Sequence, residues 1–155
     1  MTVAHIMEKS LEFCCKKEKN TREQIVEYMQ AGRSNVHSDF RYALARTLCE
    51  LINESNIYAI YLFGSTVKDD ARIASDIDLV VHVKSKEEKL LSLLEKLNFE
   101  LLQCYKKLLG EKALNINKFL DVHLVDDREV KDGDGYGILL SSIFNRPLKI
   151  WSKAS

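Results

Sequence analysis

Two segments in which aspartate alternates with apolar residues constrain the fold of this chain more than any other feature. In DIDLVVHV (76–83), one side of an extended chain carries Ile77, Leu79, Val81 and Val83, and the other carries Asp76, Asp78, Val80 and His82. FLDVHLV (119–125) alternates in the same way and places Asp121 on the side away from Leu120, Val122 and Leu124. Because successive side chains of a strand point to opposite faces, each segment predicts a strand with one face packed on helices and one face carrying aspartate.

The aspartates predict a metal site if the two strands are neighbours. Asp76, Asp78 and Asp121 would then converge into one acidic cluster. Burying a carboxylate is costly, and carboxylates that lie side by side also repel one another. A divalent cation is the usual compensation, and ligands that are all oxygen suit Mg²⁺ or Mn²⁺.

A glycine and a serine end the apolar run before the first aspartates. The run IYAIYLF (57–63) predicts a buried strand, and Gly64 and Ser65 follow it directly. A glycine lets the backbone approach a phosphate closely, and the amides of a following turn can donate to its oxygens. Ser65 adds a hydroxyl donor, and Lys68 and Arg72 could neutralise phosphate charge.

The rest of the chain predicts helices before this region and mixed elements after it. Residues 1–54 predict three helices, the second beginning at a capping box of Thr21 and Gln24 and the third capped by Ser38. Ser85 and Glu88 predict the start of a Leu-rich helix that runs to about residue 109, with Asn98 as an interruption. We expect a loop over residues 126–137, a short helix in YGILLSSIF (136–144) and a closing edge strand in PLKIW (147–151).

Composition limits the class of protein. The 155 residues are enough for one ordinary domain, and no apolar run approaches the length of a membrane span. The N-terminus does not resemble a signal peptide, and the four cysteines form no C-x-x-C pair, so we expect reduced thiols in a cytoplasmic protein. Lys plus Arg and Asp plus Glu are equal at 23 each, which argues against long nucleic acid as a partner but not against a small phosphorylated ligand.

The segment GSTVKDDARIASDID (64–78) resembles the signature of the DNA polymerase beta-like nucleotidyltransferase superfamily: Gly-Ser, ten residues, then Asp-x-Asp. The later aspartate and the closing strand extend the resemblance over roughly residues 55–151. It implies an α+β fold, with a small mixed sheet flanked by helices and preceded by an N-terminal helical segment. The expected organisation is a segment of residues 1–54 that packs on a nucleotidyltransferase core of residues 55–155.

The resemblance also implies a function. Asp76 and Asp78 would bind Mg²⁺ and the triphosphate of a nucleoside triphosphate such as ATP, while Asp121 would complete a second metal site and help to deprotonate the attacking hydroxyl. That hydroxyl, on a small molecule or a protein, would attack the α-phosphorus and release pyrophosphate. Small members of the superfamily carry a basic residue directly after Gly-Ser and a glycine three positions later, where this chain has Thr66 and Asp69.

Two other functions stay open at this point. A non-catalytic, antitoxin-like interaction module could keep the fold and nucleotide binding, as the amphipathic N-terminal helices and the acidic Asp69 and Asp70 would allow. Transfer to the end of an RNA is the other. His82 and His123 fall on the aspartate faces and are interpreted as half-buried structural histidines. The sequence specifies neither the acceptor nor the base, and its extra helices are compatible with a homodimer.

Overall fold

The computed structural model describes residues 2–52, 54–141 and 147–153. Its helices are α1 (Val3–Glu18), α2 (Arg22–Gln30), α3 (Ser34–Leu48), α4 (Glu88–Leu109) and α5 (Asp127–Asp132). Short 3-10 helices are η1 (Gly64–Thr66), η2 (Gly110–Ala113) and η3 (Gly135–Ser141). The strands are β1 (Ile57–Phe63), β2 (Ile77–Val83), β3 (Leu120–Val125) and β4 (Leu148–Ser152). The predicted α+β class, with a helical segment before a small sheet, is confirmed.

The strands form one mixed sheet in the order β3-β2-β1-β4. β1 pairs antiparallel with β2 and with β4, and β2 pairs parallel with β3. The mixed sheet and the closing edge strand are therefore as predicted. The register aligns Phe63 with Asp78, and Asp78 with Asp121. The end of β1 and the beginnings of β2 and β3 consequently meet at one edge of the sheet.

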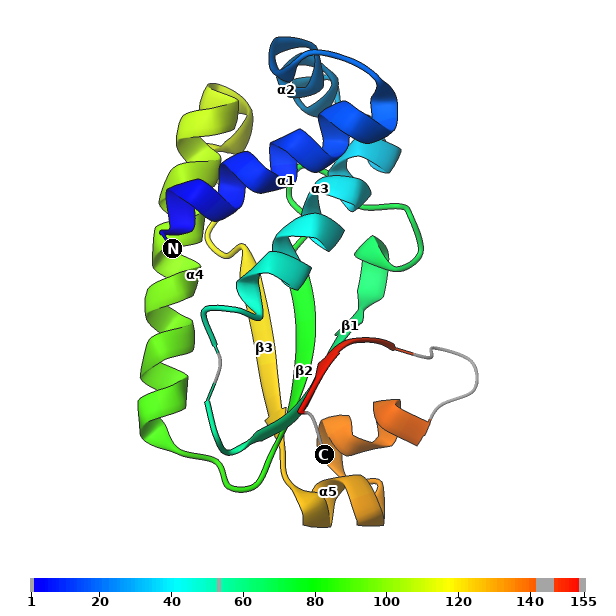
Figure 1. Ribbon diagram of the computed structural model, residues 1–155, viewed down its shortest axis with the longest axis vertical. Helices are drawn as coiled ribbons and strands as arrows, with labels where there is room; N and C mark the ends of the chain where they lie inside the picture. The colour runs from blue at the N-terminus through cyan, green and yellow to red at the C-terminus, as the bar shows by residue number, and fades with distance from the viewer. Residues whose placement is uncertain (1, 53, 142–146, 154–155) are drawn as a thin grey trace.

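One face of the sheet packs on the long helices and forms the core. The β2 side chains on this face, which are fully buried, are Ile77, Leu79, Val81 and Val83. They belong to the same hydrophobic cluster as buried residues of α1, α3 and α4. In Figure 1, α1 crosses α3 and α4 in the upper half of the molecule, while α5 lies at the opposite end. The other face of the sheet, which carries the aspartates, contacts the shorter elements α5 and η3.

One of the two helix starts predicted in the N-terminal segment is confirmed as an N-cap, but without the reciprocal bond of a capping box, because the backbone N–H of Thr21 donates to Asn20 Oδ1. Thr21 caps α2, because its hydroxyl accepts a hydrogen bond from the backbone N–H of Gln24 at 3.2 Å. The predicted start of the third helix at Ser38 was wrong, since α3 begins at Ser34. Ser38 lies buried inside that helix, and its Oγ accepts a hydrogen bond from the backbone N–H of Ala71 at 3.0 Å. Ser38 therefore does not cap a helix but binds the loop that contains Ala71.

α4 corrects two predictions. It does not begin with a capping box from Ser85, because Glu87 is the residue before the helix and no side-chain capping hydrogen bond is present there. Asn98 does not interrupt the helix either. Its Oδ1 accepts hydrogen bonds from the backbone N–H groups of Phe119 at 3.0 Å and Leu120 at 2.8 Å. Asn98 therefore fixes the beginning of β3 against α4.

The predicted loop over residues 126–137 was also wrong. Asp126 accepts a hydrogen bond from the backbone N–H of Glu129 at 2.9 Å, and the Glu129 side chain accepts one from Asp126 at 3.3 Å. This capping box begins α5, which ends at Asp132 and is followed by Gly133 in the left-handed conformation with φ 68°. η3 contains the first part of the helix predicted over 136–144, as a 3-10 helix, and residues 142–144 lie outside the described residues.

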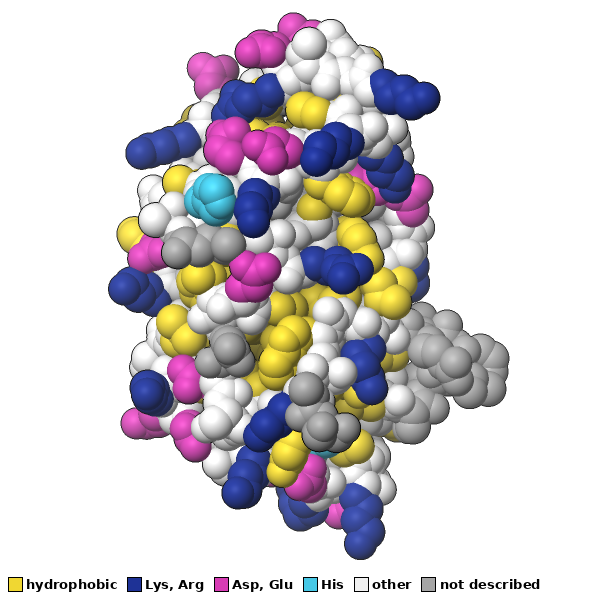
Figure 2. All heavy atoms as spheres, viewed as in Figure 1, with side chains coloured by type: hydrophobic (Ala, Val, Ile, Leu, Met, Phe, Trp, Pro, Cys, Tyr) yellow, Lys and Arg dark blue, Asp and Glu magenta, His cyan; other side chains and the backbone are white. Residues whose placement is uncertain are grey.

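The helical segment and the sheet share one hydrophobic cluster, so the predicted division at residue 54 stays a prediction. None of the helices within the described residues is long and apolar enough to cross a membrane. On the face in Figure 2, acidic and basic side chains are interspersed, and hydrophobic atoms gather in the middle. This face therefore does not present charge of one sign.

Candidate active site

Three carboxylates meet at the edge of the sheet where β1 ends and β2 and β3 begin. Asp76 directly precedes β2, Asp78 lies in β2 and Asp121 lies in β3. Each offers an oxygen within 4.8 Å of the others. Asp78 and Asp121 are direct neighbours in the parallel register, and Asp76 points to the same side because it lies two residues before Asp78. The parallel pairing of β2 and β3 therefore creates the acidic cluster.

The cluster carries more negative charge than its surroundings compensate. Burial, together with the charges of Asp121 and Asp76, raises the pKa of Asp78 to about 6. Burial and the charge of Asp121 also raise the pKa of Asp76. A bound cation would relieve both effects, because it favours the ionised carboxylates.

Asp121 differs from the other two aspartates because it has cationic or polar partners of its own. Lys118 Nζ donates to its Oδ1 at 2.5 Å, and His123 Nε2 lies 3.1 Å from its Oδ2. Burial alone would raise the pKa of Asp121, but the hydrogen bond from Lys118 and the contact with His123 hold it below its ordinary value. Lys118 was missed by the sequence analysis, since its role depends on the turn into β3.

The donor set fits a hard divalent cation. The three side chains offer only carboxylate oxygens, which are the ligands that Mg²⁺ and Mn²⁺ prefer. The side chains are partly exposed, so water or phosphate oxygens could complete a coordination shell. Asp76, Asp78 and Asp121 are the residues that could hold such an ion.

Position 64 requires a glycine because its backbone lies close to Asp78. Its φ is +80°, in the left-handed region that favours glycine, and a Cβ placed on it would lie 2.4 Å from Asp78 Oδ2. Ser65 follows within η1 and is half-buried. The Gly-Ser turn therefore lies directly against the acidic cluster, as a phosphate-binding turn beside a metal site would require.

The loop after η1 places the two predicted basic residues at the surface. Lys68 and Arg72 are exposed, and neither side chain has a hydrogen bond or ion pair with the rest of the described chain. The structure therefore does not bring them into contact with the aspartates. Asp69, at the position where small relatives carry glycine, has a left-handed φ of 58°. Asp is one of the few residues besides glycine that adopts this conformation in turns.

A buried arginine, which the sequence analysis missed, holds the loop that leads into Asp76. Arg41 of α3 is fully buried, and its Nε donates to the carbonyl of Ser75 at 3.1 Å. Its Nη2 donates to the carbonyl of Ile73 at 3.1 Å and to the hydroxyl of Tyr105 at 2.8 Å. This guanidinium connects α3 and α4 to the residues immediately before the acidic cluster.

The two histidines on the aspartate face have different surroundings. His82 pairs with Asp127 of α5 at 2.7 Å and fits the structural interpretation. His123, by contrast, contacts Asp121, and its ring stacks on Tyr136 with 3.6 Å between centroids. Tyr136 was not singled out by the sequence, because it lies in a segment whose Gly and Asp content predicted a loop.

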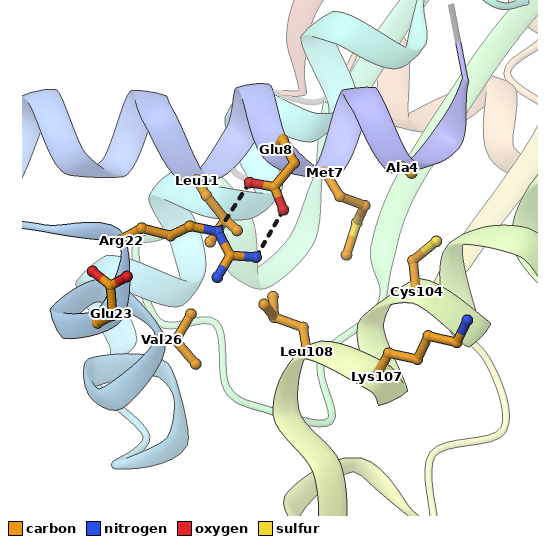
Figure 3. Close-up of a pocket in the computed structure, with 10 residues that line it drawn as sticks. All are labelled: Ala4, Met7, Glu8, Leu11, Arg22, Glu23, Val26, Cys104, Lys107 and Leu108. Carbon is orange, nitrogen blue, oxygen red and sulfur yellow. Dashed lines mark hydrogen bonds and ion pairs between the residues drawn. The ribbon is translucent and has the colours of Figure 1, made fainter.

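Two cavities differ in their relation to the cluster. One of about 380 Å³ borders Asp76 and is lined mainly by residues 111–118, Asn115 and Asn117 among them. A larger one of about 530 Å³ lies between α1, α2 and α4 and includes none of the three aspartates. In Figure 3, the Arg22 side chain points toward Glu8, another residue that lines this cavity, and donates two hydrogen bonds to it, of 3.0 and 2.7 Å.

The comparison with protein families agrees with this geometry. Residues 47–129 match the family described as Polymerase beta, Nucleotidyltransferase, which is more than half of the chain and includes all three aspartates. The chain belongs to this family, and the resemblance seen in the sequence is confirmed. Comparison with curated proteins gave no match, and comparison with solved structures gave none either.

Proposed function

We propose that this protein is a Mg²⁺-dependent nucleotidyltransferase of the cytoplasm. It moves a nucleoside monophosphate from a nucleoside triphosphate, such as ATP, to a hydroxyl of a small molecule or a protein. The observation that carries the proposal is the convergence of Asp76, Asp78 and Asp121 within 4.8 Å, directly against Gly64. Family membership supports the class of reaction.

The proposed reaction is an in-line displacement at the α-phosphorus. The acceptor oxygen forms a bond to this phosphorus, and the bond to the oxygen that bridges to the β-phosphate breaks. Pyrophosphate leaves with the electron pair, and the hydroxyl proton passes to Asp121. Mg²⁺ held by Asp76, Asp78 and Asp121 would stabilise the charge on the attacking and leaving oxygens.

The phosphates are proposed to lie along the Gly-Ser turn. The backbone at Gly64 has no side chain to keep a phosphate away, and Ser65 adds a hydroxyl. Lys68 and Arg72 have no side-chain partner elsewhere in the described chain, which leaves their charges available to the β- and γ-phosphates. Their exposure makes them contributors to affinity rather than to the reaction itself.

The acceptor is proposed to enter through the cavity that borders Asp76. Asn115 and Asn117 line this cavity and offer both donors and acceptors, which suits a molecule with hydroxyl groups. Long nucleic acid is a poorer candidate, because the chain has no excess of basic residues and the face in Figure 2 shows mixed charge.

The test uses nucleoside triphosphates labelled at the α-phosphate, added with Mg²⁺ or Mn²⁺ to the purified protein and an extract of the source cells. The Asp76→Asn/Asp78→Asn variant removes two proposed ligands at nearly constant volume. Asp132→Asn, in the exposed part of α5, is the matched control for loss of one carboxylate. We expect label on a protein or small molecule with the wild type and the control, and none with the double variant.

Three results would change the proposal. Transfer by the double Asn variant would contradict the role of the acidic cluster. Metal-dependent nucleotide binding without any release of pyrophosphate would instead favour the non-catalytic interaction module. Tight, salt-sensitive RNA binding would direct the search for the acceptor to RNA ends.

A further inference from the structure

Three aromatic rings continue the aspartate face of the sheet beyond the acidic cluster. Phe63, His123 and Tyr136 form what we call the aromatic shelf. Phe63 is paired with Asp78 across β1 and β2, and His123 lies two residues after Asp121 in β3, so both share the aspartate face. Tyr136 comes from η3, which contacts β3.

The rings of the aromatic shelf contact one another closely. Tyr136 stacks on His123 with 3.6 Å between centroids and 12° between planes. The centroid of Phe63 lies 6.4 Å from that of His123 and also 6.4 Å from that of Tyr136. The shelf begins at the metal site itself, because His123 Nε2 lies 3.1 Å from Asp121 Oδ2.

The aromatic shelf is accessible, unlike the other stacked rings near the cluster. Tyr136 is 43% exposed, although one side of its ring faces His123. The neighbouring stack of Tyr105 on Phe119, by contrast, is fully buried in the core. Aromatic rings normally bury their surface when packing allows it, so an exposed ring stacked beside a polar site is suited to a planar ligand.

We infer that the aromatic shelf binds the nucleobase of the donor nucleoside triphosphate. This inference rests on the proposed function, in which the phosphates lie at the Gly-Ser turn and the α-phosphate at the acidic cluster. The nucleoside then extends from the cluster over the sheet, and the rings next to Asp121 are the first planar surface it meets. The cavity beside Asp76, lined by amide, charged and aliphatic side chains, stays available to the acceptor.

The chemistry of the aromatic shelf also indicates its selectivity. Every nucleobase has a π-face, so stacking on Tyr136 stabilises any of the four by about 1–3 kcal/mol. Hydrogen bonds to base edges would be needed for strict discrimination, and the shelf offers few polar atoms for them. We therefore expect purine triphosphates, with their larger rings, to bind more tightly than pyrimidine triphosphates, but not exclusively.

The test compares two ligands, in Mg²⁺, by titration calorimetry. One is a nucleoside triphosphate, and the other is inorganic tripolyphosphate, which has the phosphates but no base. Tyr136→Leu removes the exposed ring, and Tyr136→Phe keeps it without the hydroxyl. Phe99→Leu, at a 64% exposed ring on α4, is the matched control for loss of a surface aromatic.

We expect Tyr136→Leu to weaken nucleoside triphosphate binding by about 5- to 150-fold and to leave tripolyphosphate binding unchanged. Tyr136→Phe and Phe99→Leu should bind both ligands like the wild type. Equal binding of the nucleoside triphosphate by the wild type and Tyr136→Leu would overturn the inference, including the case in which only the KM for the acceptor changes. Failure of the wild type to bind either ligand would contradict the proposed function, and the inference with it.

Discussion

Arg41 Nη2 donates a hydrogen bond to the carbonyl of Ile73 at 3.1 Å, which ties a buried guanidinium of α3 to the loop before Asp76. The same side chain donates to His37 and Tyr105, and the described residues provide no carboxylate as its hydrogen-bond partner. Burial lowers the pKa of Arg41 below its ordinary value. A buried cation held by carbonyls and a hydroxyl can only keep its charge if that geometry is maintained.

Replacing Arg41 should therefore affect both stability and the metal site. Arg41→Lys cannot reproduce the planar set of donors, so we expect a loss of about 2–4 kcal/mol in unfolding free energy and weaker Mn²⁺ binding. Urea unfolding and a Mn²⁺ titration by paramagnetic resonance measure the two effects. Arg46→Lys, on the same helix but bonded only to the Tyr42 hydroxyl at the surface, is the control. Wild-type Mn²⁺ affinity in Arg41→Lys would show that the loop does not depend on this contact.

Removing the charge of Asp78 should stabilise the metal-free protein. The raised pKa of about 6 means that the folded state binds more protons than the unfolded state between about pH 4 and 6. Stability from this group therefore falls as pH rises through that window and is absent at pH 7. Because the carboxylate is partly exposed, we expect Asp78→Asn to gain only about 1–2 kcal/mol at pH 7.

With Mg²⁺ present, we expect the wild type to be more stable than Asp78→Asn. The ion stabilises the wild type by binding only the folded state, whereas Asp78→Asn has lost a ligand. Thermal unfolding at pH 7, with and without Mg²⁺, measures both effects. Asp132→Asn should behave like the wild type in each. An Asp78→Asn variant that gains as much from Mg²⁺ as the wild type does would remove Asp78 from the metal site.

Replacing Gly64 by alanine should disturb Asp78, and replacing Gly32 should not. The two variants therefore separate this steric contact from backbone strain. Gly64 and Gly32 have nearly the same φ, +80° and +79°, but only at Gly64 would a Cβ meet a neighbour, Asp78 Oδ2 at 2.4 Å. Both Gly→Ala variants should lose about 1 kcal/mol or more through backbone strain. Only Gly64→Ala should also abolish Mn²⁺ binding. Equal Mn²⁺ affinity in the two variants would mean that the Gly64 contact does not position Asp78.

The protein should lose stability in mild acid because of His37. Its Nε2 donates to the carbonyl of Met29 at 2.7 Å and its Nδ1 accepts from Arg41 Nη1 at 3.0 Å, which fixes the neutral ring. Burial and the charge of Arg41 lower its pKa to about 4. Between about pH 6.5 and 4 the unfolded state therefore binds the extra proton, and the folded state loses up to about 3 kcal/mol as pH falls.

This acid sensitivity can be assigned by substitution. His37→Gln should flatten the decline of unfolding free energy between pH 6.5 and 4, measured by urea unfolding at each pH. His5→Gln, at an exposed position of α1, should leave the decline unchanged. A decline of the same slope in His37→Gln would place the responsible group elsewhere.

The sheet and its acidic cluster were predictable because their signals are local. Alternation within seven or eight residues specified β2 and β3. The one long-range assumption was that these strands are neighbours, and the structure pairs them in parallel with Asp121 beside Asp78. Apolar and aromatic composition likewise specified β1 over residues 57–63 as the structure has it.

Two of the errors fall where a side chain bonds to a partner far away in the chain, whereas the helix missed at residues 127–132 begins at a local capping box. Ser38 and Asn98 have the chemistry of a cap and of a helix breaker, but they bond to Ala71 and to the start of β3. Arg41 was missed for the same reason, since the carbonyls of Ile73 and Ser75 that it bonds lie 32 and 34 residues further along the chain. Local propensity cannot indicate contacts made across more than 20 residues of sequence.

The central place of β1 has a consequence for synthesis of the chain. β1 is an uncharged, seven-residue apolar strand that pairs with β2 on one side and with β4 on the other, and β4 ends only at Ser152. Until that residue has been added by the ribosome, the nascent protein presents β1 as an open edge, the type of surface that recruits strands from other chains. Chains that lack β4 are therefore prone to aggregate, and the pairing of β4 with β1 removes this hazard.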